Sequence, residues 1–289
     1  NQMIQIYFST LINEYFKRLK MEYKKEMASQ FLGQNLEMSS IEKFKIMVQN
    51  SGPIFQKFLQ VGSLSKDLPL ELKETLKALQ TSVRPVPYFK IKKILENEAQ
   101  NYQIKNFDKN PLGVGTMNQV HRAKVIHPVT GKPTNVAFQF QKPGADTKIM
   151  EDERIFTEIA KIMDSRPDLV KMSAPKISPI VMDIVNGARA ELNRKDTLER
   201  HKQGAKSYSG QTDWLMSSNY KTKIIYRVPE IIDSLTENSH IIVSELVQGE
   251  SLDKAADPYM NLAPDMKRLV IDSLVRLWVK TSFFENGFY

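Results

Sequence analysis

The chain has 289 residues, of which 41% are hydrophobic and 26% charged, a composition typical of a globular protein with a sizeable core. It contains no cysteine, which excludes disulfide bonds and cysteine-ligated zinc, and its four histidines lack the spacing of a metal site. The formal net charge of +8 is compatible with an ordinary basic surface or with attraction to an anionic partner. The lysines are dispersed and no zinc-finger or RNA-binding signature is present, so specific nucleic-acid binding is not expected. No apolar run reaches the roughly 18 residues of a membrane-spanning helix, and the first residues lack a signal-peptide pattern.

The first hundred or so residues are predicted to be helical. Apolar residues recur at intervals of three and four over residues 3–32, which predicts one helix with a basic second half, typical of a core or helix-pairing face and compatible with a membrane-surface role. Ser39 and Glu42 have the spacing of a capping box at the start of a second helix. Three further helices are expected, over residues 54–61, from Leu68 to the prolines that follow Arg84, and over residues 88–100.

After Pro111 the pattern changes to short β-rich segments that alternate with helices, which predicts an α+β fold. Strands are expected over residues 120–126, 135–141, 224–228 and 240–246. Helices are expected over residues 148–163, 180–208 and 264–284, with a polar loop over residues 209–218.

The segment from Pro111 to Val120 predicts a strand, a glycine-containing turn and a second strand. Gly113 and Gly115 would let backbone N–H groups approach an anion such as a phosphate, although the same glycines could simply make a hairpin turn. The following strand of such a sheet usually presents a lysine to the phosphates, but this position is Gln139, which carries no charge.

Six motifs occur in the same order as in the UbiB-type atypical kinases, a protein-kinase-like family associated with ubiquinone biosynthesis. The chain resembles this family over roughly residues 50–289. Lys57 and Gln60 correspond to the lysine and glutamine of the family's KxGQ signature, which lies on a helix before the kinase lobe. The other matches are to the alanine-rich loop (residues 111–121), the strand Val-Ala-Val-Lys-Val-Gln-Arg-Pro-Gly (136–144), the Glu-x-Asp of helix αC (191–193), the hinge (245–253) and the segment before the catalytic loop (283–289).

The resemblance implies a protein-kinase-like N-lobe, with an antiparallel sheet and an αC helix, preceded by an all-helical extension and followed by only the start of a helical C-lobe. The expected divisions are residues 1–107 for the extension with its KxGQ-like helix, 108–248 for the N-lobe with a helical insertion, and 249–289 for the start of the C-lobe. The chain ends at Tyr289, before the family's catalytic loop and metal-binding motif, so we expect it to be a piece of a longer protein. No catalytic residue and no metal ligand is therefore assigned.

The resemblance also implies a site for ATP or ADP with Mg²⁺. Lys57 and Gln60 would lie on a helix that covers the nucleotide pocket, where Lys57 could face the phosphates. Each of these residues, and each of those given next, could instead have an ordinary structural role in a turn, in a strand or on a solvated helix face. The implied nucleotide-binding residues are Gly113, Val114, Gly115, Thr116, Gln119, Gln139, Glu191, Glu245 and Leu246.

Four positions depart from the family pattern. Gln139 replaces the strand lysine, so Glu191 would lack its usual partner, and Asn193 replaces the aspartate of Glu-x-Asp. Leu59 replaces the glycine of KxGQ, and Gly113 stands in a loop that is closer to the ordinary kinase glycine loop.

These departures leave more than one function open. The resemblance implies an atypical kinase or ATPase with a small-molecule or lipid-linked role, whereas Gln139 favours a pseudokinase that acts as a scaffold or binds a partner. A weaker third possibility is that the basic helical front binds an anionic membrane surface or lipid. The family habit implies an intracellular protein, soluble or membrane-peripheral, in mitochondria or the bacterial cytoplasm.

Overall fold

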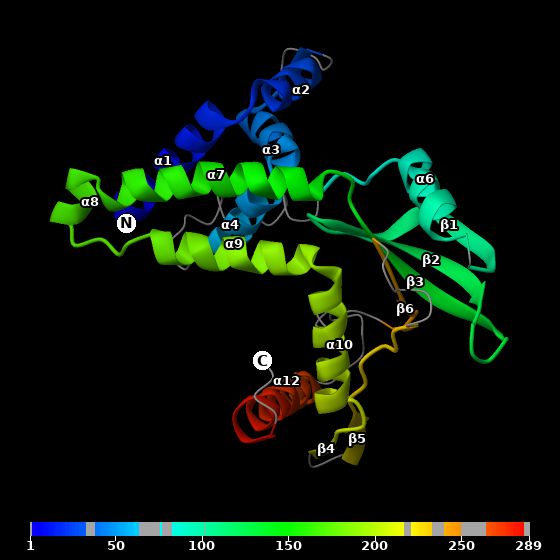
Figure 1. Ribbon diagram of the computed structural model, residues 1–289. Coiled ribbons are helices and arrows are strands. Elements are labelled where there is room, and N and C mark those ends of the chain that lie inside the picture. The colour runs from blue at the N-terminus through cyan, green and yellow to red at the C-terminus, as the bar shows by residue number, and fades with distance from the viewer. Residues whose placement is uncertain are drawn as a thin grey trace. The chain divides into compact units, whose positions relative to one another are not determined.

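The computed structural model describes residues 2–32, 38–63, 76, 83–100, 102–216, 221–232, 240–249 and 264–285. It combines helices with a four-stranded antiparallel sheet in the order β1-β2-β3-β6 and a two-stranded sheet, β4-β5 (Figure 1). This architecture confirms the α+β, kinase-like fold expected from the sequence. The chain divides into two compact units, the first formed by Asn1–Ile94, Lys109–Val120 and Gln139–Asn193 and the second by Leu95–Asp108, His121–Phe138 and Arg194–Tyr289.

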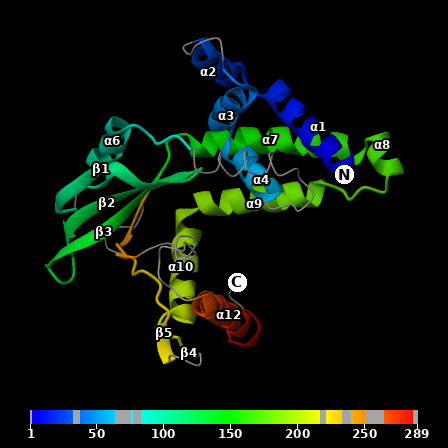
Figure 2. The same cartoon turned by 180° about the vertical axis from the view of Figure 1, so that it is seen from behind.

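The first unit is built mainly from helices around one apolar core. Within it α7 packs against α9, and α4 packs against both, as seen from opposite sides in Figures 1 and 2. Aromatic side chains from three helices meet in the core, where the rings of Tyr15 and Phe55 stack at 4.1 Å and Phe156 lies beside them. The helices are α1 (Gln2–Arg18), α2 (Met21–Leu32), α3 (Ser40–Asn50), α4 (Pro53–Ser63), α7 (Ala145–Asp164), α8 (Pro167–Lys171) and α9 (Ser178–Leu192), and α6 (Tyr88–Glu98) begins in this unit.

The helices expected after Ser39 and over residues 54–61 are confirmed as α3 and α4. The capping box of Ser39 and Glu42 is present at the start of α3, as the sequence predicted. The single helix expected over residues 3–32 is wrong, because the chain forms two helices, α1 and α2. The helix expected from Leu68 lies outside the described residues apart from residue 76.

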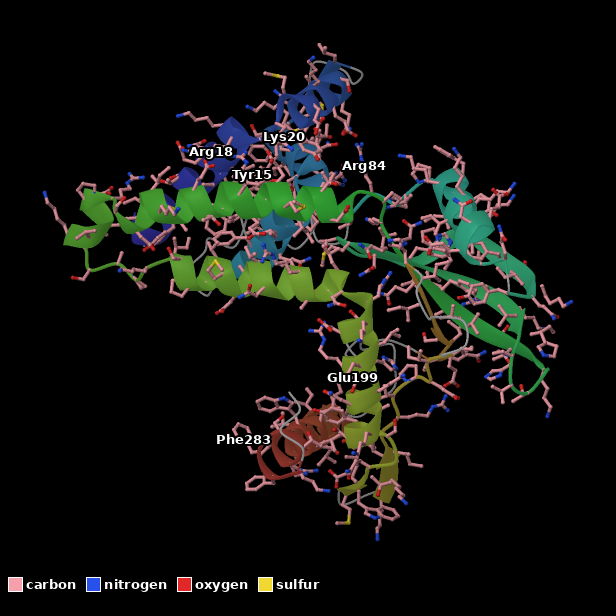
Figure 3. The ribbon with its side chains drawn as sticks, viewed as in Figure 1. Tyr15, Arg18, Lys20, Arg84, Glu199 and Phe283 are labelled. Atoms are coloured by element: carbon pink, nitrogen blue, oxygen red, sulfur yellow. The ribbon has the colours of Figure 1, made fainter. Side chains whose placement is uncertain are left out.

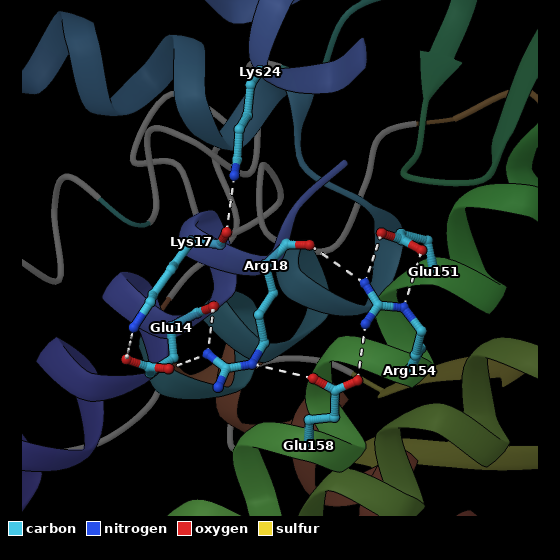
Figure 4. A network of polar contacts seen from close by, with 7 residues as sticks. All are labelled: Glu14, Lys17, Arg18, Lys24, Glu151, Arg154 and Glu158. Atoms are coloured by element: carbon cyan, nitrogen blue, oxygen red, sulfur yellow. Dashed lines mark hydrogen bonds and ion pairs between the residues drawn. The ribbon is translucent and has the colours of Figure 1, made fainter. Parts of the chain in front are cut away.

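Side chains from elsewhere satisfy the carbonyl groups at the end of α1, which explains its break from α2 (Figure 4). Lys24 Nζ donates to the carbonyl of Lys17 at 2.8 Å, and Arg154 Nη2 donates to the carbonyl of Arg18 at 3.3 Å. Because α1 packs against α7, this network ties the end of α1 to its neighbour. The ion pairs drawn in Figure 4 are Lys17–Glu14, Arg18–Glu14, Arg18–Glu158, Arg154–Glu158 and Arg154–Glu151.

The N-terminus of α4 is capped by a side chain from α7. Pro53 is the first helical residue and has no N–H, so the free donors are the N–H groups of Ile54 and Phe55, which donate to Asp152 Oδ2 at 2.8 and 3.2 Å. Gly52, the residue before the helix, has no side chain that could act as a cap. Asp152 therefore supplies the acceptor that the local sequence lacks.

A tyrosine from α1 completes this cluster. Tyr15 Oη donates to Asp152 Oδ1 at 2.6 Å and accepts from the N–H of Gly52 at 2.8 Å, and in Figure 3 the Tyr15 side chain lies beside α7. A Cβ on Gly52 would lie 2.1 Å from Asp152 Oδ1, so only glycine fits there. Burial raises the pKa of Asp152 to about 7, although the hydrogen bonds from Tyr15, Ile54 and Phe55 each lower it.

The four-stranded sheet has one buried face. In β2 (Asn118–Ile126) and β3 (Pro133–Gln141) alternate residues are buried, as expected for strands that cover a core on one side. The strands predicted over residues 120–126, 135–141 and 240–246 are thus confirmed, the last as β6 (Ile241–Glu245). β1 (Ile104–Val114) starts earlier than the change of pattern at Pro111 suggested.

Three predicted elements from residue 180 onward differ from the structure, and one of them, the strand expected over residues 224–228, lies three residues earlier, at Lys221–Ile225. The helix expected over residues 180–208 is two helices, because α9 ends at the cap residue Asn193 and α10 follows as Arg194–Tyr208. The loop expected over residues 209–218 contains a strand, β4 (Thr212–Met216), which pairs with β5 (Lys221–Ile225). The C-terminal helical prediction is confirmed by α12 (Pro264–Val279) and the π-helical turn Lys280–Glu285. The domain boundaries expected at residues 107 and 248 stay predictions.

Replacing Asp152 by alanine should lower the free energy of unfolding by about 3 kcal/mol, because two backbone donors and one buried hydroxyl would lose their acceptor. Chemical denaturation measures this loss. Asp183→Ala, at an exposed position on α9, is the matched control and should change stability by no more than about 0.5 kcal/mol. A loss below about 1 kcal/mol for Asp152→Ala would show that the cap does not hold α4.

Candidate functional site

Lys57 on α4 and Glu191 on α9 form an ion pair within the first unit. The Lys57 side chain is 20% exposed and the Glu191 side chain 45%, so the pair lies at the edge of the core and not inside it. Glu191 does lack the usual strand lysine, since that position is Gln139, but it is not unpaired. Its partner is the lysine of the KxGQ-like helix, while Gln139 lies half-buried on β3.

The packing of α4 places Lys57 at this position. Ile54, Phe55 and Leu59 are at most 3% exposed and turn one face of α4 into the core, which leaves Lys57 beside that face. Leu59 stands where the family signature has glycine, and its side chain fills part of the core. Gln60, the last residue of the KxGQ-like motif, is half-buried on the same helix.

The neighbouring helix α9 presents Glu191 in a similar way. Val185 and Ala188 are fully buried, and Glu191 follows Ala188 by three residues, close to the end of the helix. Arg189, in the last turn, pairs with Glu153 of α7 at 2.6 Å and so fixes α9 to its neighbour. Asn193 terminates the helix and is exposed, so it lies beyond the helical turn that carries Glu191.

The glycine-containing loop does not need glycine for its backbone conformation. Neither Gly113 nor Gly115 has a positive φ angle. A Cβ on Gly113 would meet nothing within 4 Å, and one on Gly115 would touch only the carbonyl of Asn118 at 3.4 Å. The turn is closed by the N–H of Gly115, which donates to the carbonyl of Asn118 at 2.8 Å. The hairpin-turn explanation thus gives no reason for glycine at Gly113.

The loop at Gly113–Thr116 is anchored to the core by the residue that follows it. Met117 is 1% exposed and belongs to the core, and its carbonyl accepts from the N–H of Lys142 at 2.7 Å. Val114 and Thr116 are half-buried, and Gly115 between them is exposed. The loop therefore has a fixed base and an accessible outer backbone.

Gln119 has a different environment from the other predicted site residues. It is fully buried, its Oε1 accepts from the N–H of Val86 at 2.7 Å, and its Nε2 donates to the Val86 carbonyl at 3.1 Å. Lys142 Nζ donates to the nearby carbonyl of Arg84 at 3.1 Å, and burial, with a smaller contribution from Lys148, lowers the Lys142 pKa to about 8. Gln119 and Lys142 thus hold the segment that precedes α6.

Glu245 and Leu246 lie in the second unit, at the end of β6. The N–H of Glu245 donates to the backbone carbonyl of Glu230 at 2.8 Å, and the N–H of Leu246 donates to the backbone carbonyl of Asn135 at 3.2 Å. The Glu245 carboxylate is paired with Arg227, which lowers its pKa. Both backbone N–H groups at this hinge-like position are therefore engaged in pairing the segment with its neighbours.

The described part of the chain offers neither a metal-binding cluster nor a membrane-spanning helix. In those residues no three or more His, Cys, Asp or Glu side chains form a group that could hold a metal ion. No helix in the same residues has both the length and the apolar character needed to cross a membrane.

A family model described as the ABC1 atypical kinase-like domain matches residues 78–288. The chain therefore belongs to the ABC1 family of atypical kinase-like proteins, and the resemblance to UbiB-type kinases is confirmed. It is 26% identical over 260 residues to "Probable protein kinase UbiB" of Xylella fastidiosa, with 88% of this chain and 43% of that protein covered. It is 23% identical over 259 residues to "Uncharacterized protein slr0889" of Synechocystis sp., with 85% and 58% covered.

The chain thus spans about half the length of the curated relatives it matches. Among solved structures it is similar to Rv3197 of Mycobacterium tuberculosis, described in complex with erythromycin, at 16% identity and a TM-score of 0.42. That match covers 80% of this chain and 53% of the other.

A double-mutant cycle should detect the pair of Lys57 and Glu191. Lys57→Met and Glu191→Gln remove the charges and keep the side-chain length, and we expect a coupling energy of about 0.5 to 1 kcal/mol in urea unfolding because both groups are partly solvated. The pair of Arg189 and Glu153 is the control, since its coupling should persist when Lys57 is replaced. Coupling indistinguishable from zero between Lys57 and Glu191 would show that the pair does not form.

Proposed function

We propose that this chain is the nucleotide-binding part of an atypical kinase or ATPase, which binds ATP or ADP with Mg²⁺ between the loop at Gly113–Thr116 and the helix α4. The ion pair between Lys57 and Glu191 carries this proposal. It joins the KxGQ-like helix to the αC-like glutamate, in a chain where the strand position is Gln139. The positive charge that a kinase strand lysine would supply is thus provided from a different element.

In this proposal Lys57 exchanges partners when nucleotide binds. A polyphosphate carries more negative charge than the Glu191 carboxylate, so it would compete for the Lys57 ammonium group. The open space beside Gly113 would let phosphate oxygens approach the backbone closely. Mg²⁺ would arrive with the nucleotide and be held chiefly by its phosphate groups.

The residues of the loop fit this role unequally. Gly113 has free space, whereas the N–H of Gly115 is bonded within the turn and would serve a phosphate only after the turn opens. Gln119 would act as a support of the loop, because its amide is bonded to Val86.

A second candidate function is that of a pseudokinase, which Gln139 favours. Glutamine supplies no positive charge to a nucleotide phosphate. Nucleotide binding would then regulate a scaffold or a partner-binding surface. A small-molecule or lipid-linked role of the whole protein is proposed from the family alone.

Gln139→Lys tests the proposed position of the phosphates. A new charge about 10 Å from a polyphosphate, at an effective dielectric constant near 20, contributes roughly 1.5 kcal/mol, so we expect Mg-ADP to bind about tenfold more tightly. Titration calorimetry and the thermal shift with millimolar Mg-ADP measure the effect. Asn135→Lys is the control, because it adds the same charge on the same side of β3, about 13 Å along the strand.

Weaker binding by Gln139→Lys would contradict the strand register of the site. An equal gain in Mg-ADP affinity in the Asn135→Lys control would mean that the added charge attracts the nucleotide non-specifically. No thermal shift of the wild-type chain at millimolar nucleotide would contradict nucleotide binding altogether.

A further inference from the structure

The hairpin of β4 and β5 has two different faces. In the pairing register Asp213 lies opposite Ile224 and Leu215 lies opposite Thr222, so these four side chains share one face. This face lies on α12: Leu215 is 2% exposed, and Asp213 accepts from Ser273 at 2.6 Å and from Arg276 at 2.7 Å. In Figures 1 and 2 the hairpin and α12 lie next to each other.

The opposite face of the hairpin, which we call the outer face, is apolar and open. Trp214, Met216 and Ile225 are 48%, 61% and 67% exposed, although the hairpin is anchored through its other face. Three large apolar side chains on one side of five-residue strands form a contiguous patch, and such patches mark interaction sites. In full, the outer face consists of Thr212, Trp214, Met216, Lys221, Lys223 and Ile225.

The charged side chains of the outer face have one sign. Lys221 and Lys223 are both exposed, and the outer face contains no acidic residue. Lys221 Nζ lies 4.5 Å from the centre of the Trp214 ring, a cation–π contact that holds the ammonium group beside the apolar patch. The outer face is therefore complementary to a partner that has a negatively charged surface and an apolar layer directly below that surface.

We propose that the outer face docks onto an anionic lipid bilayer. Tryptophan prefers the interfacial region of membranes, where its ring is buried and its N–H stays hydrated. Met216 and Ile225 would enter the acyl boundary beside the Trp214 ring, and the lysine stems would extend along the surface to reach lipid phosphates. The docking does not depend on nucleotide binding, which is proposed for residues of the first unit.

The composition of the outer face favours lipid over other anionic partners. Proteins that bind single-stranded nucleic acid stack successive bases on several aromatic rings, whereas here Trp214 is the only aromatic side chain on this face. An acidic protein surface would pair with the lysines, but its acidic groups would offer no apolar contact to Trp214, Met216 and Ile225, which lie beside the lysines. A bilayer satisfies both features at once.

Vesicle sedimentation tests the proposal. The chain is mixed at low salt with phosphatidylcholine vesicles, with or without about 30% phosphatidylserine, and binding is expected only with the anionic lipid. Lys221→Glu with Lys223→Glu should reduce the partition coefficient at least tenfold, and Trp214→Ala should reduce it several-fold. Lys90→Glu with Lys93→Glu, two exposed lysines of α6, is the matched control with the same change of net charge and should stay within about twofold of wild type.

Tryptophan fluorescence gives an independent readout, because the chain has two tryptophans, Trp214 and Trp278. In a Trp278→Phe background the emission of Trp214 should shift to shorter wavelength on adding anionic vesicles. Absence of vesicle binding or equal losses in the α6 control would each overturn the proposal. Binding that persists in both hairpin variants would overturn it as well and place the membrane contact elsewhere, such as on the basic second half of residues 3–32.

Discussion

The buried carboxylate of Asp152 at the N-terminus of α4 is the contact on which the candidate site depends. It accepts the N–H groups of Ile54 and Phe55, and so it fixes where α4 begins. Two residues later the same helix carries Lys57, whose ion pair with Glu191 links α4 to α9. A shift in the start of α4 would rotate Lys57 by about 100° for each residue and would separate the pair.

This arrangement explains why the chain tolerates a polar group inside its core. Isolated burial of a carboxyl group is costly, but three donors surround Asp152, and each donor would itself be unsatisfied without it. Replacement of this cluster by apolar side chains could retain stability but would leave α4 free to start elsewhere. Gly52 belongs to the same arrangement, because any side chain there would occupy the position of the carboxylate. The cluster thus specifies the position of the signature helix and, through it, the site.

Features with a local cause were predictable from the sequence. The capping box of Ser39 and Glu42 and the alternating strands each depend on residues a few positions apart. Features that depend on distant partners were not predictable. The end of α1 is stabilised by Arg154, more than a hundred residues later, and β4 is a short strand between glycine- and serine-rich segments that gains its stability from α12.

The candidate site likewise contains features that the sequence indicated and features that it did not. Residue types and spacing identified Lys57 and Glu191 as members of a family motif, but their pairing spans 134 residues of sequence and needed the structure. Asp152 carried one usable signal, an acidic residue within the apolar periodicity of α7, and the sequence pattern alone did not reveal its partner. The structure explains the substitution at Leu59, whose side chain packs α4 into the core, and in our proposal Lys57 provides the charge that Gln139 lacks.

The most direct test measures the coupling energy between Lys57 and Glu191 in chains that carry Asp152→Asn, a substitution that preserves the shape of the side chain while replacing one acceptor oxygen by a donor. If the cap sets the register of α4, the coupling measured in the wild-type background should fall to zero within error, while the coupling between Arg189 and Glu153 should be retained. An unchanged coupling of Lys57 to Glu191 in the Asp152→Asn background would contradict the account.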